Sequence, residues 1–205
     1  MSVKIYLEGG GGRQDSKALK IKCQEGFNRL FRKMGYSGRM PRLVACGSRN
    51  STYTDFTIGL QEPRLDYVAM LIDSEDPVKN PEKPWEHLKG RDDWDRPDCS
   101  DDENVLLMTT CMETWITSDR DTLKEYYRRR GTLQESALPP LSGIEGRNRH
   151  DIQDQLMQAT RNTTQPYSKG KVSFDLVGEL NPEVLKDHLV AFQRMKRILD
   201  EKLSP

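Results

Sequence analysis

Cysteine is scarce in this sequence, and long apolar runs are missing from it. The four cysteines, at positions 23, 46, 99 and 111, stand far apart without a C-x-x-C pair, which argues against a disulfide framework and a zinc ribbon. No stretch approaches the roughly 18 apolar residues that a membrane-spanning helix needs. The first seven residues lack the basic-then-apolar layout of a signal peptide. We therefore expect a cytoplasmic protein that makes no use of a membrane.

An excess of charge of one sign is also missing. The sequence has 32 Lys and Arg against 32 Asp and Glu, so its formal net charge is zero. This balance excludes a histone-like mode of binding, in which bulk positive charge supplies the affinity for nucleic acid. It leaves room for a locally basic groove. With 205 residues, of which 35% are hydrophobic, the chain is long enough for one domain with its own core.

Four short apolar runs predict β-strands, and helical patterns separate them. The runs span residues 3–7, 42–46, 67–72 and 105–110. The third is apolar throughout, as in a strand buried on both faces of a parallel sheet. Helical periodicity over 16–34, and more weakly over 51–60, lies between the first three. This alternation predicts an α/β fold, in which sites form at the carboxyl ends of the strands.

The second half of the chain differs in character. Residues 76–104 contain four prolines and a dense acidic stretch from Asp92 to Glu103, so we expect a long inserted loop without regular structure. Helical patterns follow it, and together the segments predict a single domain, 1–205, with a sheet core in 1–118 and a mainly helical C-terminal part in 119–205. The predicted helices span 119–130, 150–161 and 181–199.

Acidic residues follow two of the predicted strands. Glu8 comes directly after the first strand, and Asp73, Glu75 and Asp76 come after the third. Charges at the end of a buried strand are costly unless they are solvated, paired or bound to a cation. If the chain stays extended, Asp73 and Glu75 point the same way and, with Glu8, surround one point with oxygen atoms. Such a set suits Mg²⁺, although solvated loop acids or helix caps give the same pattern.

This arrangement resembles the Toprim domain of topoisomerases, primases and OLD-type nucleases, in which Glu-Gly follows the first strand and an acidic pair follows the third. Five segments are similar, more closely, to a family of small bacterial Toprim-like proteins, whose members tend to be encoded beside ABC/AAA-type ATPases. One departure is that Glu75 is followed by Asp76, which leaves the second member of the acidic pair open. The similar segments are 6–10, 44–50, 71–77, 85–88 and 111–115.

The resemblance implies a Toprim-like parallel-sheet sandwich and Mg²⁺- or Mn²⁺-dependent hydrolysis of phosphodiester bonds in DNA or RNA. Glu8 resembles the Toprim glutamate that acts as acid–base or metal ligand, and Asp73 with Glu75 or Asp76 resembles the metal-binding pair. Glu113 follows the fourth strand and is a candidate further ligand, or else an acid favoured at a helix start. The ATPase neighbours imply an effector of an ATPase-coupled bacterial defence system.

Basic residues and glycines supply candidate contacts to phosphate. OLD-like nucleases place a basic residue after their acidic motifs, and Lys169 or Lys171 fits that position, where a cation stabilises charge that develops in the transition state. The glycine run from residue 9 comes just before a predicted helix start, an arrangement that favours binding of an anion. The run does not match the Walker A sequence. An exposed basic turn and a flexible glycine turn are the structural alternatives. The candidate phosphate-binding residues are Gly9, Gly10, Arg13 and Arg49.

Two other functions stay open at this point. The chain is too short for the strand-passage machinery of a topoisomerase, which leaves nuclease activity as the leading expectation. A non-catalytic regulatory or binding subunit of a partner ATPase would keep the fold without binding a metal. A nucleotide-binding phosphotransfer enzyme would use the glycine run instead of the acidic residues.

Overall fold

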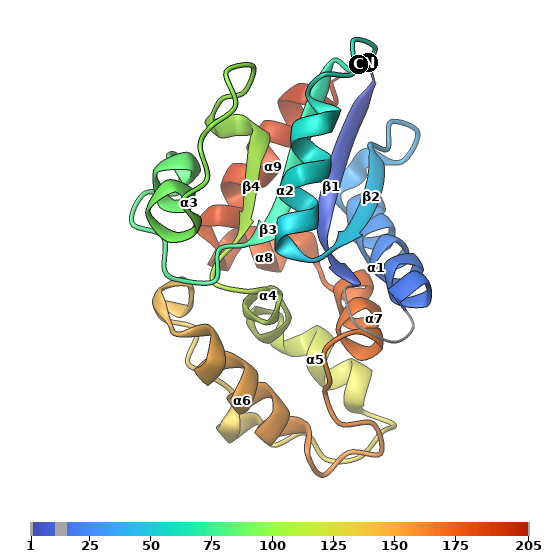
Figure 1. Cartoon of the computed structure of the whole chain (residues 1–205). Helices are drawn as coiled ribbons and strands as arrows, with labels where there is room; N and C mark the ends of the chain where they lie inside the picture. The colour runs from blue at the N-terminus through green and yellow to red at the C-terminus, as the bar shows by residue number, and fades with distance from the viewer. Residues whose placement is uncertain (1, 11–15, 205) are drawn as a thin grey trace.

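Four parallel strands form the centre of the protein in a computed structural model that describes residues 2–10 and 16–204. They lie in the order β2-β1-β3-β4, and each neighbouring pair is parallel (Figure 1). The predicted α/β fold with a parallel sheet is confirmed. The first three strands run one to three residues beyond their predicted ends, and the fourth stops two residues short. The strands are β1 (Val3–Gly10), β2 (Arg42–Gly47), β3 (Tyr67–Asp73) and β4 (Val105–Met108).

One face of the sheet packs against the first and last helices of the chain. Alternate residues of a strand point to opposite faces, and on this face Ile5 and Leu71 are fully buried. Helix α1 (Ser16–Phe31) covers β1 and β2, and helix α9 (Val190–Lys202) covers β4. The chain therefore closes this side of the core with segments from both of its ends (Figure 1).

The opposite face of the sheet is covered by α2 (Arg49–Gly59) and α3 (Pro84–Asp92), the helices that follow the second and third strands. Tyr6 and Met70 belong to a second core on this side. Helix α2 crosses β1, β2 and β3, and helix α3 contacts β4. Because both faces are covered, the strands read as apolar runs, as expected for a parallel sheet.

The inserted segment 76–104 has regular structure, so the expectation of an irregular loop is wrong. Helix α3 occupies its middle, and a short turn of 3₁₀ helix, Asp102–Asn104, leads into β4. Pro84 stands at the first helical position, where proline is well tolerated, and not in a loop. Trp85 and Leu88 are buried against the sheet, which is what holds the segment in place.

Several helices of the C-terminal half, among them α4, α5 and α6, lie beyond the carboxyl ends of the strands (Figure 1). Helix α7 packs along α1, and α4 contacts α6 and α7. Neither α4 nor α7 is among the helices expected from the sequence. The helices of this part are α4 (Met112–Ser118), α5 (Arg120–Tyr127), α6 (Arg149–Thr160), α7 (Lys171–Glu179) and α8 (Pro182–His188), with short helical turns at Glu135–Ala137 and Ile144–Gly146.

The last predicted helix is divided in two. Asn181 caps α8, accepting a hydrogen bond from the backbone N–H of Glu183 at 3.1 Å, as its position before Pro182 predicts. Leu189 then leaves helical geometry at φ −126° and ψ 112°, and α9 begins after it. A helical turn, Arg32–Tyr36, likewise extends α1 and contains Gly35 at φ 92°. Among the helices that the structure describes, none is long and apolar enough to cross a membrane.

The contact between α1 and α7 depends on Gly26. A Cβ atom at Gly26 would lie 2.3 Å from the backbone oxygen of Phe174, and no side-chain rotation relieves a clash with backbone. We expect Gly26→Ala to lower the free energy of unfolding by about 1–3 kcal/mol, measured by urea denaturation.

Gly90→Ala in α3 is the matched control for that change. Nothing lies within 4 Å of a Cβ atom at Gly90, so alanine should leave stability unchanged or raise it by up to about 1 kcal/mol. Equal losses for the two variants would show that helix packing at Gly26 is not the cause.

Candidate functional site

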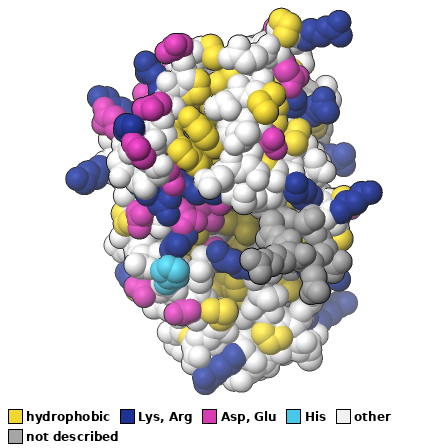
Figure 2. Space-filling view, in the orientation of Figure 1, with side chains coloured by type: hydrophobic (Ala, Val, Ile, Leu, Met, Phe, Trp, Pro, Cys, Tyr) yellow, Lys and Arg dark blue, Asp and Glu magenta, His cyan; other side chains and the backbone are white. Residues whose placement is uncertain are grey.

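A cavity of about 240 Å³ opens at the carboxyl ends of the strands. Strand ends form one side of it, and the starts of α4 and α7 form the other. Figure 2 shows this part of the surface hollowed, with acidic and basic side chains gathered along one side of the hollow. Its charged lining consists of Glu8, Asp73, Glu113 and Lys169.

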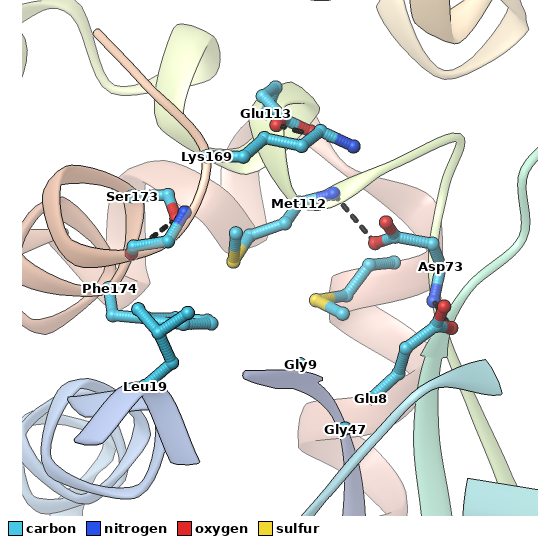
Figure 3. A pocket seen from close by; sticks show the side chains of 12 residues that line it. Glu8, Gly9, Leu19, Gly47, Asp73, Met112, Glu113, Lys169, Ser173 and Phe174 are labelled. Atoms are coloured by element: carbon cyan, nitrogen blue, oxygen red, sulfur yellow. Dashed lines mark hydrogen bonds and ion pairs between the residues drawn. The ribbon is translucent and has the colours of Figure 1, made fainter. Parts of the chain in front are cut away.

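Glu8 and Asp73 meet on adjacent strands. The backbone N–H of Asp73 donates to Oε2 of Glu8 at 3.2 Å, and Oδ1 of Asp73 accepts from the backbone N–H of Met112 at 2.8 Å (Figure 3). The two residues come together because β1 and β3 pair with Leu7 opposite Leu71, so that both strands deliver their next polar residue to the same edge. The contact that the sequence predicts between these strand ends is therefore present, while their role as metal ligands stays a prediction.

Glu113 lies across the cavity from that pair and is fully buried. Its Oε1 accepts from the hydroxyl of Tyr167 at 2.7 Å, and its Oε2 accepts from Nε2 of Gln153 at 3.3 Å. Burial, and then the charge of Glu113, raise the pKa of Tyr167 well above its usual value, so the hydroxyl keeps the proton that it donates. Nothing in the sequence pattern singles out Tyr167 or Gln153, because only the packing of α6 and of the segment that follows it brings them to Glu113.

Lys169 and Lys171 take different positions. Nζ of Lys169 lies 3.8 Å from Oε1 of Glu113, and its side chain is 60% exposed at the edge of the cavity (Figure 3). Lys171 is the exposed first residue of α7. The geometry thus places Lys169, rather than Lys171, beside the carboxylates.

The carboxylates crowd one another. The pKa of Asp73 is raised well above its usual value, chiefly by burial and then by the charges of Glu8 and Glu113. Lys169 and the Met112 N–H act in the opposite direction without cancelling these effects. Burial also raises the pKa of Glu8, against the opposing charge of Arg49. A cation held between these groups would relieve the repulsion that produces part of the shift.

Glu75 and Asp76 point away from Glu8, Asp73 and Glu113. Strand β3 ends at Asp73, and Glu75 has a left-handed backbone with φ 70°, so the expectation that Asp73 and Glu75 point the same way is wrong. Glu75 pairs with Arg91 at 3.1 Å and also with Arg149, and exposed Asp76 pairs with Arg91 at 3.0 Å. Both acids therefore pair with arginines and not with the other carboxylates around the cavity.

Arg49 lies behind Glu8. Its Nη1 is 3.4 Å from Oε2 of Glu8 and donates to the backbone oxygen of Asp73. Its Nε and Nη2 bind the two carboxylate oxygens of Asp92 at 3.0 and 2.7 Å, and the Trp94 ring centroid lies 5.1 Å from the guanidinium. A direct contact with phosphate, which the sequence suggests for Arg49, requires some of these bonds to exchange.

The glycine run is only partly within the described residues. Gly9 lines the cavity at φ 146°, and a Cβ atom there would lie 2.9 Å from Sγ of Cys23, so this position requires glycine. Gly10 is the last residue of β1. Arg13 lies outside the described residues, and the anion cradle that it would complete stays a prediction.

The other wall of the cavity is apolar. It comes from the strand end of β4 and from three helices, and its Leu19 and Phe174 side chains stand opposite Glu8 and Asp73 (Figure 3). The cavity can therefore take a ligand with both a charged and an apolar part. The apolar wall consists of Leu19, Met108, Met112 and Phe174.

The fold and the cavity define an α/β protein with an acidic, partly apolar site at the ends of a parallel sheet. The chain belongs to the family described as "Domain of unknown function (DUF4276)", which matches residues 15–200. The matched region contains Asp73, Glu113 and Lys169, and it begins after the strand that carries Glu8. Comparisons with curated proteins and with solved structures found no match.

Asp73→Asn tests the crowding of the carboxylates. An acid whose pKa is higher in the folded than in the unfolded state costs stability as the pH rises above its unfolded value, about 3.9 for Asp. We therefore expect the metal-free variant to match the wild type near about pH 4 and to become the more stable of the two toward about pH 7. Urea denaturation across this range measures the difference.

Asp98→Asn, at an exposed position of the inserted segment, is the control for the loss of one negative charge. Its stability relative to the wild type should vary little over the same range. An advantage of Asp73→Asn that shrinks as the pH rises would instead assign Asp73 a favourable ion pair.

Proposed function

We propose that this protein is a divalent-cation-dependent nuclease that hydrolyses phosphodiester bonds in DNA or RNA. The observation that carries the proposal is the convergence of Glu8, Asp73 and Glu113 on one cavity with Lys169 beside them. Burying several carboxylates together is unfavourable unless positive charge joins them. The resemblance of the strand-end residues to Toprim nucleases supports the same chemistry.

The donor set fits a hard cation. Mg²⁺ is commonly bound through one or two carboxylates, and waters and substrate phosphate complete its coordination. Glu8 and Asp73 supply such a pair, while Glu113 is held by Tyr167 and suits a contact through water. Among the described residues, no group of three or more acidic, histidine or cysteine side chains is close enough to enclose an ion. An open site of two carboxylates is the arrangement that leaves room for phosphate.

The residues of the chain have separate roles in this proposal. Asp73 is oriented by the Met112 N–H, and Glu8 acts as the second ligand or accepts the proton of the attacking water. A bound Mg²⁺ or Mn²⁺ supplies Lewis acidity and a water of lowered pKa. Lys169, at the edge of the cavity, stabilises the negative charge that develops on the phosphoryl oxygens.

The apolar wall favours a nucleotide unit over a bare phosphate. Leu19 and Phe174 stand opposite the carboxylates, where a sugar or base next to the scissile phosphate would lie. Ligand sites commonly combine such an apolar lining with a few polar groups that fix orientation. This supports nucleic acid as the substrate class.

We also propose that a partner ATPase, of the ABC/AAA type suggested by the resemblance, delivers the substrate. A formal net charge of zero gives little long-range attraction for a polyanion. The acidic stretch from Asp92 to Glu103 begins next to the site, where Asp92 binds Arg49, and ends at the amino ends of the strands, where Glu103 lies beside Tyr67. The negative charge near its start opposes nucleic acid further. Weak binding by the isolated protein makes a partner useful for activity in a bacterial defence system.

Cleavage assays with site variants test the nuclease proposal. With Mn²⁺ and end-labelled DNA and RNA, Glu8→Gln and Asp73→Asn should each slow cleavage by about a hundredfold or more, because each removes a ligand charge worth several kcal/mol. Lys169→Ala should slow it by about ten- to a hundredfold and Lys171→Ala by less, since only Lys169 lies beside the carboxylates. Lys186→Ala, an exposed lysine on α8, is the control.

The other functions give different results in the same experiments. A wild-type protein that binds no Mn²⁺ by calorimetry contradicts the proposal and favours a regulatory subunit. Saturable ATP binding that survives Glu8→Gln, without nuclease activity, favours a nucleotide-binding phosphotransfer enzyme.

The partner proposal is tested by adding the neighbouring ATPase to the cleavage assay. We expect weak cleavage by the isolated protein and at least about tenfold faster cleavage with the ATPase, because delivery replaces the missing electrostatic attraction. A triple variant, Asp93→Asn with Asp95→Asn and Asp98→Asn, removes exposed negative charge and leaves the Asp92–Arg49 ion pair intact. Without the ATPase, this variant should cleave faster than the wild type. Vigorous cleavage by the isolated wild type that neither change affects would contradict the proposal.

A further inference from the structure

The Arg49 guanidinium is shared between two carboxylates, of which Glu8 lines the cavity and Asp92 does not. Asp92, at the end of α3, takes two parallel hydrogen bonds from Nε and Nη2 at 3.0 and 2.7 Å. Glu8 receives only a long contact from Nη1, at 3.4 Å. Two-point pairing of arginine with a carboxylate is the stronger geometry, so Asp92 is the main partner of this cation.

The pair is built into the fold. The side chains of Arg49 and Asp92 are 12% and 10% exposed. The ring of Trp94 lies near the guanidinium, and it stacks on Tyr53 with centroids 4.2 Å apart. Arg91 adds a third bond to Asp92, from Nη1 at 2.5 Å. These contacts restrict where the Arg49 guanidinium can lie.

The partner that Arg49 prefers decides how much negative charge Glu8 presents. While Asp92 holds the guanidinium, Glu8 remains a carboxylate with one weak contact to it. If Asp92 lost its charge, Arg49 would carry an unpaired positive charge in a partly buried place, where its nearest acid is Glu8. A two-point bond from Arg49 to Glu8 would then compete with any cation at the site.

We propose that Asp92 is a positioning residue of the metal site: by pairing with Arg49, it keeps that cation from neutralising Glu8. This inference rests on the proposed function, because it concerns cation binding by Glu8 and Asp73. It also assigns a role to the inserted segment, since the last residue of α3, Asp92, binds Arg49 behind Glu8. Asp92 touches neither the cation nor the substrate.

Calorimetric titration of the full chain with Mn²⁺ tests the inference without an activity assay. Asp92→Asn keeps the shape of the side chain and should weaken Mn²⁺ binding about tenfold, as typical for a residue that orients a ligand. In the double variant Arg49→Gln with Asp92→Asn, no charge remains to compete for Glu8. Its affinity should return to within about threefold of the wild type, a non-additive effect expected only of residues that act on one another.

Asp93→Asn is the matched control. It makes the same change of charge one residue further along, where the side chain is 88% exposed and pairs with Lys89 instead of Arg49. Its Mn²⁺ affinity should stay within about twofold of the wild type, because exposed charges act weakly at a distance. Melting temperatures of all variants without metal report on the docking of α3.

The outcomes separate this inference from the proposed function. If the wild-type protein binds no Mn²⁺, it has no metal site and both proposals are wrong. If the wild type binds and Asp92→Asn binds equally well, the positioning role is wrong while the proposed function stands. If Asp92→Asn and the double variant are equally weak, with lowered melting temperatures, Asp92 acts by holding α3 and the positioning role is again wrong.

Discussion

The parallel pairing of β1 with β3 places the Glu8 carboxylate against the backbone N–H of Asp73, and the rest of the site is arranged around the charge that this contact buries. These two acids are largely buried at adjacent strand ends, and the starts of α4 and α7 line the other side of the cavity above them. Glu113 enters from α4 and adds a third carboxylate. The geometry of a covered parallel sheet thus concentrates negative charge at one edge.

Positive charge surrounds that edge on several sides. Arg49 stands behind Glu8, and Lys169 stands at the open side next to Glu113. Arg91 and Arg149 meet at Glu75, which links α3 to α6 beside the cavity. Each of these arginines is engaged by an acid of the chain, so the cations fix the positions of neighbouring elements, whereas Lys169 alone among these four is largely exposed.

The sequence predicts much of the sheet and less of what covers its edge. The four strands are recognisable because residues buried on both faces leave continuous apolar runs. The inserted segment is misread, because Pro84 and the charged residues around α3 look like a loop when the buried contacts of Trp85 and Leu88 are not visible. The direction of Glu75 is misread for a related reason. The chain turns after β3, where the Glu75 N–H donates to the backbone oxygen of Thr110, and its carboxylate meets arginines from distant elements.

The amino-acid sequence by itself determined the α/β class, the strand limits to within a few residues, and the acids Glu8 and Asp73 at two strand ends, because these follow from local patterns of apolar and charged residues. The tertiary structure decided which other groups meet them. Glu113, Lys169 and Asp92 are far along the chain from the residues that they contact; Asp92 and Arg49, for example, are 43 residues apart. No local pattern encodes these contacts, since each arises from the packing of elements from different parts of the chain.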